Sequence, residues 1–350
     1  MRKIISALLL VCLSLSLFSC KKEEVRSRVI SDNEFFDTVS SISTYNDKSD
    51  KTIEAYVEMS REVLSYYHKL FDIYHEYQGV NNLKTINDNA GVSPVKVDEN
   101  LIVFLEYCKE LYTITKGKTN VMLGSVLRLW HDARTMANDN YGFIDESELP
   151  SLSELEAANQ HTSIDLLVID RAASTVYISD PEASIDVGAI AKGYAVDRLI
   201  ERLKEKGASS VVLNVGGNIR TIGLKPGKEK WKSAITNPDT SSDESLICKI
   251  SIGESSVVTS GDYERYFFAG DTAYHHIIDP ETLYPSRYFS SVTILTESSV
   301  LADALSTALF CMSYEEGLSL VNSIGGIEVV WVDLEYNVLT TPGTEIEKLV

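Results

Sequence analysis

Asp303 and Thr307 lie one helical turn apart in the segment 302–307 and have the residue types to bind a metal ion. Residues four apart on a helix project from the same face, so a carboxylate and a hydroxyl would point in one direction. Both are hard oxygen donors of the kind that Mg²⁺ takes in a near-octahedral shell. The residues alone leave a second interpretation open, in which Thr307 bonds to its own helix backbone and Asp303 is solvated near the helix start.

Two glycine-containing turns are candidates for binding an anion. Between Asp186 and Lys192, glycines flank an expected strand-to-helix turn, and the free N–H groups of a helix start attract anions. Lys192 adds a mobile cation. Gly216 and Gly217 follow a second apolar strand and would allow close approach of a ligand or backbone. A tight strand–helix connection and a simple hairpin turn are the plain alternatives for the two segments.

Two adjacent histidines, His275 and His276, stand in an expected strand. Neighbouring strand residues point to opposite faces, so one ring can face a cavity while the other packs. A purely structural role for both remains open. The spacing does not suit a zinc pair on one strand face, and the chain has no Cys-x-x-Cys pair, so neither zinc nor an iron–sulfur cluster is expected.

The composition narrows the class of protein. The chain has 350 residues, 44% of them hydrophobic, and a net charge of −19. This is an ordinary globular composition with length for one large domain or two modest ones. The negative charge argues against nucleic-acid binding, which needs a Lys/Arg surface. It is compatible with a ligand neutralised by a metal ion or by a few local cations.

The first residues predict export. Arg2 and Lys3 precede an apolar run over 4–18, which is the length of a signal peptide and short for a membrane span. The run ends at Cys20 in a pattern that resembles a bacterial lipobox, where the cysteine is lipidated; a plain secretory signal with an incidental cysteine is the alternative. The expected organisation is a signal peptide over 1–19, a lipidated polar tether over 20–33 and one domain over 34–350, exported and anchored to a bacterial membrane.

The mature chain predicts a mixed α/β (α+β) fold with much antiparallel pairing. Strands are expected over residues 34–45, 166–170, 175–179, 184–187, 210–215, 256–260, 263–268, 273–279, 291–296, 328–333 and 338–341. Helices are expected over 53–77, 100–116, from the turn at 193 to Gly207, and over 301–312, with a weaker signal at 153–158.

Five ordered motifs together resemble the ApbE family, the FAD:protein FMN transferases. They are the glycine-rich turn 186–193, the Gly-Gly strand end 215–218, the Ser-Gly-Asp-Tyr-Glu-Arg segment 260–265, the His-Ile-Ile-Asp-Pro segment 276–280 and the Ala-Asp-Ala-x-x-Thr helix 302–307. The resemblance spans about residues 34–345 and implies an ApbE-like fold.

The resemblance implies roles for individual residues. Mg²⁺ would be held by the Ala189 carbonyl, Asp303 and Thr307. The flavin contacts it implies are Phe36, Tyr74, Asn120, Val121, Met122, Asp186, Lys192 and Ile277. Phe36 stands in Phe36-Asp37-Thr38, where Asp37 replaces a family glycine.

The implied reaction cleaves FAD and joins FMN covalently to a Thr or Ser hydroxyl of an acceptor protein, with release of AMP. His276 is the candidate base, and Lys192 would help to hold phosphate. The family suggests electron-transport subunits of the Rnf or Nqr type as acceptors. Two alternatives stay open at this point: an FAD pyrophosphatase that passes FMN to water, and a flavin-binding lipoprotein without turnover.

Overall fold

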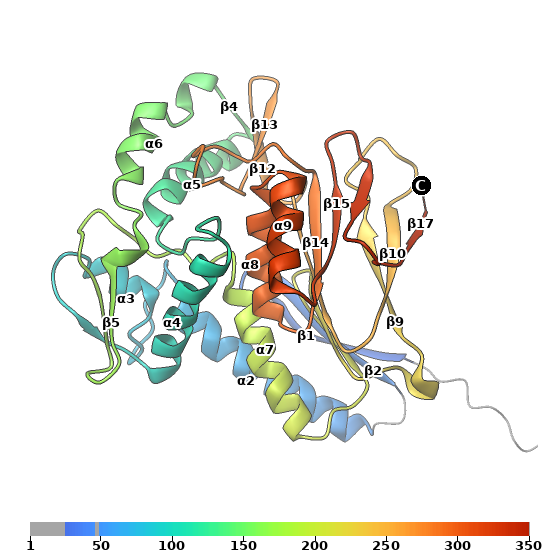
Figure 1. Cartoon of the computed structure of the whole chain (residues 1–350). Helices are drawn as coiled ribbons and strands as arrows, with labels where there is room; N and C mark the ends of the chain where they lie inside the picture. The colour runs from blue at the N-terminus through green and yellow to red at the C-terminus, as the bar shows by residue number, and fades with distance from the viewer. Residues whose placement is uncertain (1–24, 46–48, 350) are drawn as a thin grey trace, which may run out of the picture.

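A computed structural model describes residues 25–45 and 49–349 of the chain. The expected signal peptide and the lipobox Cys20 lie outside these described residues. Figure 1 shows a large sheet with helices packed against it.

The large sheet has eight strands in the order β1-β2-β7-β8-β11-β14-β15-β16, and each neighbouring pair is antiparallel. Its strands are β1 (Val25–Phe35), β2 (Thr38–Tyr45), β7 (Val211–Val215), β8 (Asn218–Ile222), β11 (Ser256–Gly261), β14 (Ser291–Thr296), β15 (Glu328–Val332) and β16 (Val338–Thr340). The predicted mixed fold with largely antiparallel sheets is therefore confirmed.

The polar tether expected over 20–33 is wrong from Val25 onward, because these residues form strand β1 and pair with β2. The segment reads as polar since β1 is an edge strand with much of its length exposed. Ile30 and Phe35 alone among its apolar side chains reach the core. Arg26 and Arg28 instead form ion pairs with acidic residues at the start of the following helix.

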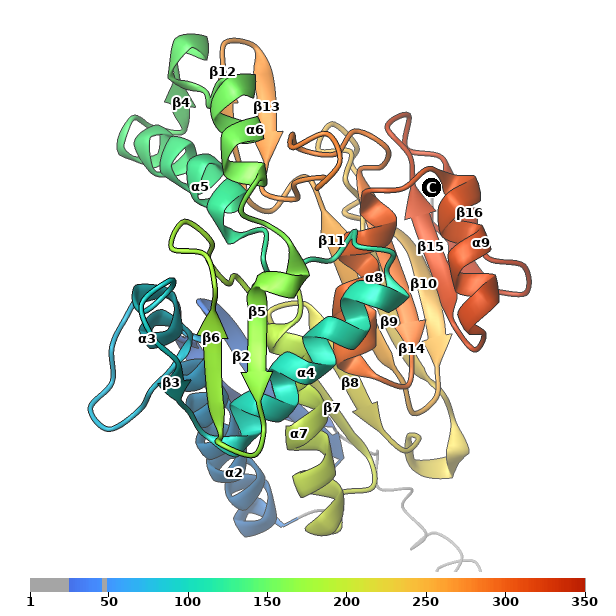
Figure 2. The same ribbon diagram turned by 60° about the vertical axis from the view of Figure 1, so that its left-hand side comes forward.

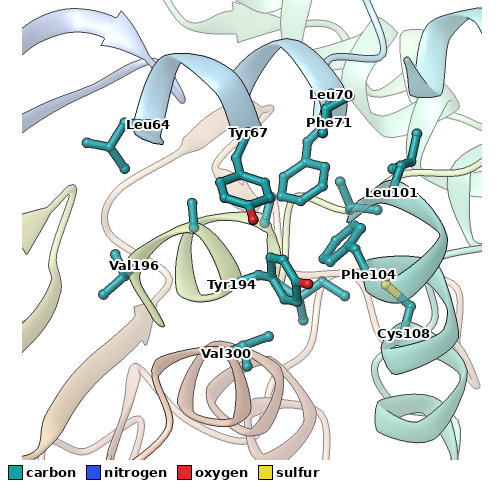
Figure 3. Packing of buried hydrophobic residues seen from close by; sticks show 14 of the residues in the cluster. Leu64, Tyr67, Leu70, Phe71, Leu101, Phe104, Cys108, Tyr194, Val196 and Val300 are labelled. Atoms are coloured by element: carbon teal, nitrogen blue, oxygen red, sulfur yellow. The ribbon is translucent and has the colours of Figure 1, made fainter. Parts of the chain in front are cut away.

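Helices cover one face of this sheet. They are α2 (Asp50–Phe71), α7 (Ala191–Glu205), α8 (Ser299–Phe310) and α9 (Tyr314–Ile324), with α4 (Glu99–Ile114) packed outside α2 and α7. Figure 3 shows the aromatic centre of this layer, where the rings of Phe71 and Phe104 stack at 4.0 Å and Tyr194 of α7 meets Phe104 edge-on at 4.9 Å. These contacts fix α7, which follows the glycine-rich turn.

A second sheet covers the opposite face. Its strands β17 (Ile346–Lys348), β10 (Leu246–Ile252) and β9 (Trp231–Thr236) bury apolar side chains against those of β11, β14 and β15. None of these three strands was expected from the sequence. Strand β9 alternates buried and exposed residues and β17 has only three residues, which are weak signals beside the apolar strands of the large sheet.

Two smaller three-stranded sheets complete the fold, as Figure 2 shows. One contains β3 (Val95–Lys96), β6 (Thr175–Ile178) and β5 (Leu167–Asp170) and lies near α3 (Leu83–Asp88). The other contains β13 (Thr272–His275), β12 (Tyr266–Ala269) and β4 (Phe143–Ile144) and lies beside α5 (Gly124–Asp139), which α6 (Leu152–Asn159) contacts. Among the described residues, no helix is both long and apolar enough to cross a bilayer.

The strand expected over 184–187 is wrong. The N–H and carbonyl of Ile185 bond to the side chain of Asn87, and the Asp186 N–H bonds to the Val121 carbonyl. A side-chain amide thus takes the place of a partner strand. The helix expected over 53–77 ends earlier, at Phe71, where Asp72 caps it.

Candidate functional site

The start of helix α7 is capped by a carboxylate from helix α8. Ile190, the residue at the N-cap, offers no side-chain acceptor. Asp303 Oδ2 instead accepts a 2.6 Å hydrogen bond from the Gly193 N–H, one of the backbone donors that a helix start leaves unsatisfied. The carboxylate also meets the positive end of the helix dipole. Asp303 and the glycine-rich turn are therefore in direct contact.

Helix α8 is capped in return by a carboxylate from α7. Asp197 accepts hydrogen bonds from the backbone N–H groups of Ser299 and Val300 and from the hydroxyl of Ser298. This mutual capping requires the two helix starts to lie very close. A Cβ on Gly193 would come within 2.6 Å of the Val300 Cα, so only glycine fits there.

Two other predicted metal ligands carry oxygens that are not engaged. In a regular helix the Gly193 N–H would donate to the Ala189 carbonyl one turn earlier, but here it donates to Asp303. The Ala189 carbonyl therefore accepts no hydrogen bond from the described part of the chain. The Thr307 hydroxyl also lacks a hydrogen-bond partner in residues 25–45 and 49–349. The alternative in which Thr307 bonds back to its helix is not observed; the Ser306 hydroxyl is the one that donates to the Asp303 carbonyl.

The chemistry of this donor set fits Mg²⁺. Asp303 is 4% exposed, and burial raises the pKa of its carboxyl, while the positive charge of Lys192 and the Gly193 N–H act in the opposite direction. The buried carboxylate, the carbonyl and the hydroxyl offer oxygens alone, as a hard cation prefers. In the part of the chain that the structure describes, no three His, Cys, Asp or Glu side chains gather as a metal cluster. A cation here would therefore depend on the carbonyl and hydroxyl oxygens as well as on one carboxylate.

The segment 118–122 is held between α8 and the glycine-rich turn. The Thr119 hydroxyl donates to the Ala304 carbonyl of α8, and the Val121 carbonyl accepts from the Asp186 N–H at 2.8 Å. The Asn120 side chain accepts from the Met122 N–H and donates to the Thr162 carbonyl. The predicted flavin residues Asn120, Val121, Met122 and Asp186 are thus brought together.

A buried ion pair ties this segment to the histidine motif. Lys118 Nζ lies 2.9 Å from Asp279 Oδ1, and both side chains are almost fully buried. Burial opposes the charge of Lys118, yet the hydrogen bonds to Asp279 and Glu281 raise its pKa above the usual value. The aspartate of the His-Ile-Ile-Asp-Pro motif therefore has a positioning role.

The two histidines have different surroundings, but β13 ends at His275, so the strand expected over 273–279 is too long and the strand argument does not account for His276. His275 is buried, with Nε2 2.7 Å from the Ser286 carbonyl and Nδ1 accepting from the Ile277 N–H, and burial lowers its pKa to about 4. His276 donates its backbone N–H to the Arg265 carbonyl, and its buried Nδ1 has no hydrogen-bond partner among the described residues. Burial, followed by the charge of Arg265, lowers the pKa of His276 to about 3.

Three cations act on His276, since the charges of Arg265, Arg134 of α5 and Lys192 all lower its pKa. Burial and the charge of Arg265 also lower the pKa of Arg134. Across the described ranges, none of the three makes an ion pair with a carboxylate. A group of cations without ion-pair partners among the described residues, in a protein of net charge −19, is suited to a ligand with several negative charges.

Tyr74 is positioned by the cap that ends helix α2. Asp72 Oδ1 accepts from the Tyr74 N–H at 2.7 Å. The Tyr74 ring lies 5.6 Å from the His131 ring of α5 and is 56% exposed. Burial raises the pKa of the Tyr74 hydroxyl, and so does the negative charge of Asp186, which brings Tyr74 into the same electrostatic environment as the glycine-rich turn.

Phe36 lies in a tight turn between β1 and β2, with a positive φ of 54°. Its N–H bonds to His68 Nδ1, and the Tyr77 hydroxyl bridges His68 Nε2 to Asp72. This network links Phe36 to the cap that holds Tyr74. The turn also explains Gly216, because a Cβ there would overlap the side chain of Thr38.

The chain matches the model described as the ApbE family over residues 36–331. It belongs to the ApbE family. The FAD:protein FMN transferase of Treponema pallidum is 31% identical over 275 residues, which cover 75% of this chain and 73% of that protein. The FAD:protein FMN transferase of Haemophilus influenzae is 28% identical over 91% of this chain and 90% of its own. In structure, the ApbE protein of Thermotoga maritima superimposes with a TM-score of 0.77 at 28% identity, covering 91% of this chain and 97% of its own. The resemblance predicted from the five motifs is confirmed.

Three residues of the site had no predicted role: His131, Arg134 and Arg265. Arg265 stands inside one of the five motifs, so its place beside His276 had a signal in the sequence. His131 and Arg134 lie three apart on one face of α5 and come from a segment that the sequence marks only as polar. Only the packing of α5 near β12 brings them to the site.

Proposed function

We propose that this ApbE-family chain is a magnesium-dependent FAD:protein FMN transferase. The transferase activity agrees with the names of its relatives, which align over most of the chain. The observation that carries the metal assignment is the hydrogen bond from the Gly193 N–H to Asp303, because it brings a buried carboxylate to the glycine-rich turn, where the Ala189 carbonyl accepts no hydrogen bond from the described residues.

Asp303, Thr307 and the Ala189 carbonyl would hold Mg²⁺, which, when bound, neutralises diphosphate oxygens and the charge that develops on them. Lys192 and Arg265, with Arg134, supply further positive charge for the diphosphate of FAD. Asp303 is held in place by the Gly193 N–H before the substrate arrives, so it needs little reorganisation during the reaction.

His276 is the group that takes the proton from the acceptor. The oxygen of a Thr or Ser hydroxyl attacks the FMN phosphorus, the bond from that phosphorus to the bridging oxygen breaks, and AMP leaves with that oxygen. The hydroxyl proton passes to the imidazole of His276, which is neutral because burial and the neighbouring cations lower its pKa. A bound diphosphate offsets those cations and raises the pKa of His276, so its strength as a base increases once FAD is in place.

The location of the enzyme is a further part of the proposal. Arg2 and Lys3, the apolar run over 4–18 and Cys20 support export and lipid anchoring to a bacterial membrane. An anchored enzyme would meet acceptors on the outer side of the cytoplasmic membrane, such as the Rnf-type or Nqr-type subunits that the family suggests.

The test is an assay with purified protein, FAD, Mg²⁺ and an Nqr-type acceptor subunit. We expect a fluorescent covalent adduct on the acceptor and an equal amount of AMP, and Asp303→Ala should abolish both. Asp139→Ala is the matched control, since Asp139 is an exposed helical carboxylate without a hydrogen-bond partner among the described residues. AMP release without an adduct would instead support an FAD pyrophosphatase, and FAD binding without either product would support a flavin carrier.

A further inference from the structure

Three aromatic side chains form a continuous row on the outer face of the sheet β13-β12-β4. Phe143 of β4 is paired with Phe268 of β12, and their rings stack at 5.2 Å with 17° between the planes. Phe268 meets Tyr266 edge-on at 5.6 Å. We name Phe143, Phe268 and Tyr266 the aromatic row. Phe143 is 52% exposed and Tyr266 is 44% exposed, so two of its three members face solvent.

The aromatic row is not part of the hydrophobic core between the sheet β13-β12-β4 and α5. The other face of the same sheet carries Phe267 and Tyr274, whose rings stack at 5.8 Å, and Trp130 of α5 stacks on Tyr274 at 5.8 Å. Ile144 lies on that buried side as well. The inner face therefore anchors the sheet to α5, while the outer face presents large apolar rings to water, an arrangement typical of binding surfaces.

One end of the row reaches the candidate site. Tyr266 directly follows Arg265, whose carbonyl accepts from the His276 N–H. Across the hairpin Tyr266 is paired with His275. From Tyr266 to Phe268 the strand advances about 7 Å, and β4 adds roughly 5 Å across the sheet. The row therefore runs outward from beside His276, and Figures 1 and 2 show its strands with α5 and α6 at one end of the molecule.

We propose that the aromatic row is the docking surface for the acceptor protein. This inference rests on the transferase function, which requires a second substrate to bring a hydroxyl to His276. The cations around His276 suit the diphosphate of FAD, whereas the row carries no charged side chain and cannot serve that purpose. It fits an acceptor segment with apolar side chains next to the target Thr or Ser. Three rings make a small contact, which suits an enzyme that must release its flavinylated product.

The test compares steady-state kinetics with an Nqr-type acceptor subunit for the wild type, Phe143→Ser and Tyr266→Ser. We expect the acceptor KM to rise about tenfold in each variant, the scale of a central aromatic interface residue. The KM for FAD should stay within about twofold of the wild-type value, because the row lies outside the cationic site. Phe143→Tyr keeps an aromatic ring and should leave the acceptor KM near the wild-type value. Val168→Ser is the matched control, since Val168 is 47% exposed on β5, in a different sheet.

The possible outcomes separate this inference from the function on which it rests. If the wild type and Val168→Ser form no adduct, the transferase function fails and the docking surface fails with it. If both form the adduct and the row variants keep the wild-type acceptor KM, the docking inference alone is wrong. If the row variants lose binding to anionic lipid vesicles and keep the wild-type acceptor KM, the aromatic row binds the membrane and the proposal is also overturned. Phe143 is half exposed, so Phe143→Ser is decisive even if another row variant fails to fold.

Discussion

Replacing Gly193 by alanine should destabilise the protein, although alanine is the better helix former. The added Cβ would lie 2.6 Å from the Val300 Cα, and backbone at the start of α8 cannot rotate away as a flexible side chain can. Overpacking of this kind costs about 1–3 kcal/mol, and contact with backbone puts Gly193→Ala near the upper end. The gain in helix propensity offsets about 1 kcal/mol. We therefore expect a net loss of roughly 2 kcal/mol in the free energy of unfolding.

The same substitution should impair the reaction more than it impairs folding. Moving α8 away from α7 would separate Asp303 from the glycine-rich turn, and a displacement of about 1 Å can cost roughly a hundredfold in rate. Urea unfolding and AMP release from FAD measure the two effects. Gly317→Ala is the matched control, because Gly317 lies inside α9 and its Cβ would meet only side-chain atoms, at 3.3 Å or more. A Gly193→Ala protein with the stability and turnover of Gly317→Ala would refute the close approach of the two helices.

Four other predictions concern the surroundings of the site. Because the pKa of His276 is lowered to about 3, its imidazole stays neutral down to about pH 4. The pH profile of kcat/KM for FAD should therefore show no decrease toward acid near pH 6.5. A decrease there that His276→Gln removes would contradict this. The same lowered pKa means that folded protein binds fewer protons at His276 than unfolded protein does between pH 3 and 6.5. The contribution of His276 to the free energy of unfolding should therefore fall as the pH drops below 6.5. Lys118→Met leaves Asp279 buried without its cation and should cost about 3 kcal/mol in urea unfolding, most of it recovered by adding Asp279→Asn. Arg134→Gln should raise the KM for FAD about tenfold, on the scale of a lost charge-assisted hydrogen bond, whereas Arg128→Gln on the exposed side of the same helix should not.

Local patterns predicted the parts of the site that depend on one element. The spacing of Asp303 and Thr307 gives a shared helix face wherever the helix packs. The fold class followed in the same way from the alternation of apolar segments, and the ApbE resemblance followed from the order of five motifs. All of these properties need only residue types at fixed spacing.

Properties that depend on packing could not be predicted in this way. The glycine at 193 is required because α8 lies against it, and the sequence has no sign of that contact. Residues 184–187 have the composition of a strand, but the Asn87 side chain takes the hydrogen bonds of Ile185. The polar β1 becomes ordered by pairing with β2, and Arg134 reaches the site only through the position of α5.

The most direct test of the metal assignment is isothermal titration of Mg²⁺ into the FAD-loaded protein. The account predicts one Mg²⁺ per chain for the wild type and at least a tenfold weaker affinity for Asp303→Asn, which keeps the shape of the side chain but removes the charge that a hard cation needs. An Asp303→Asn protein that binds Mg²⁺ as tightly as the wild type, and still releases AMP from FAD, would contradict it.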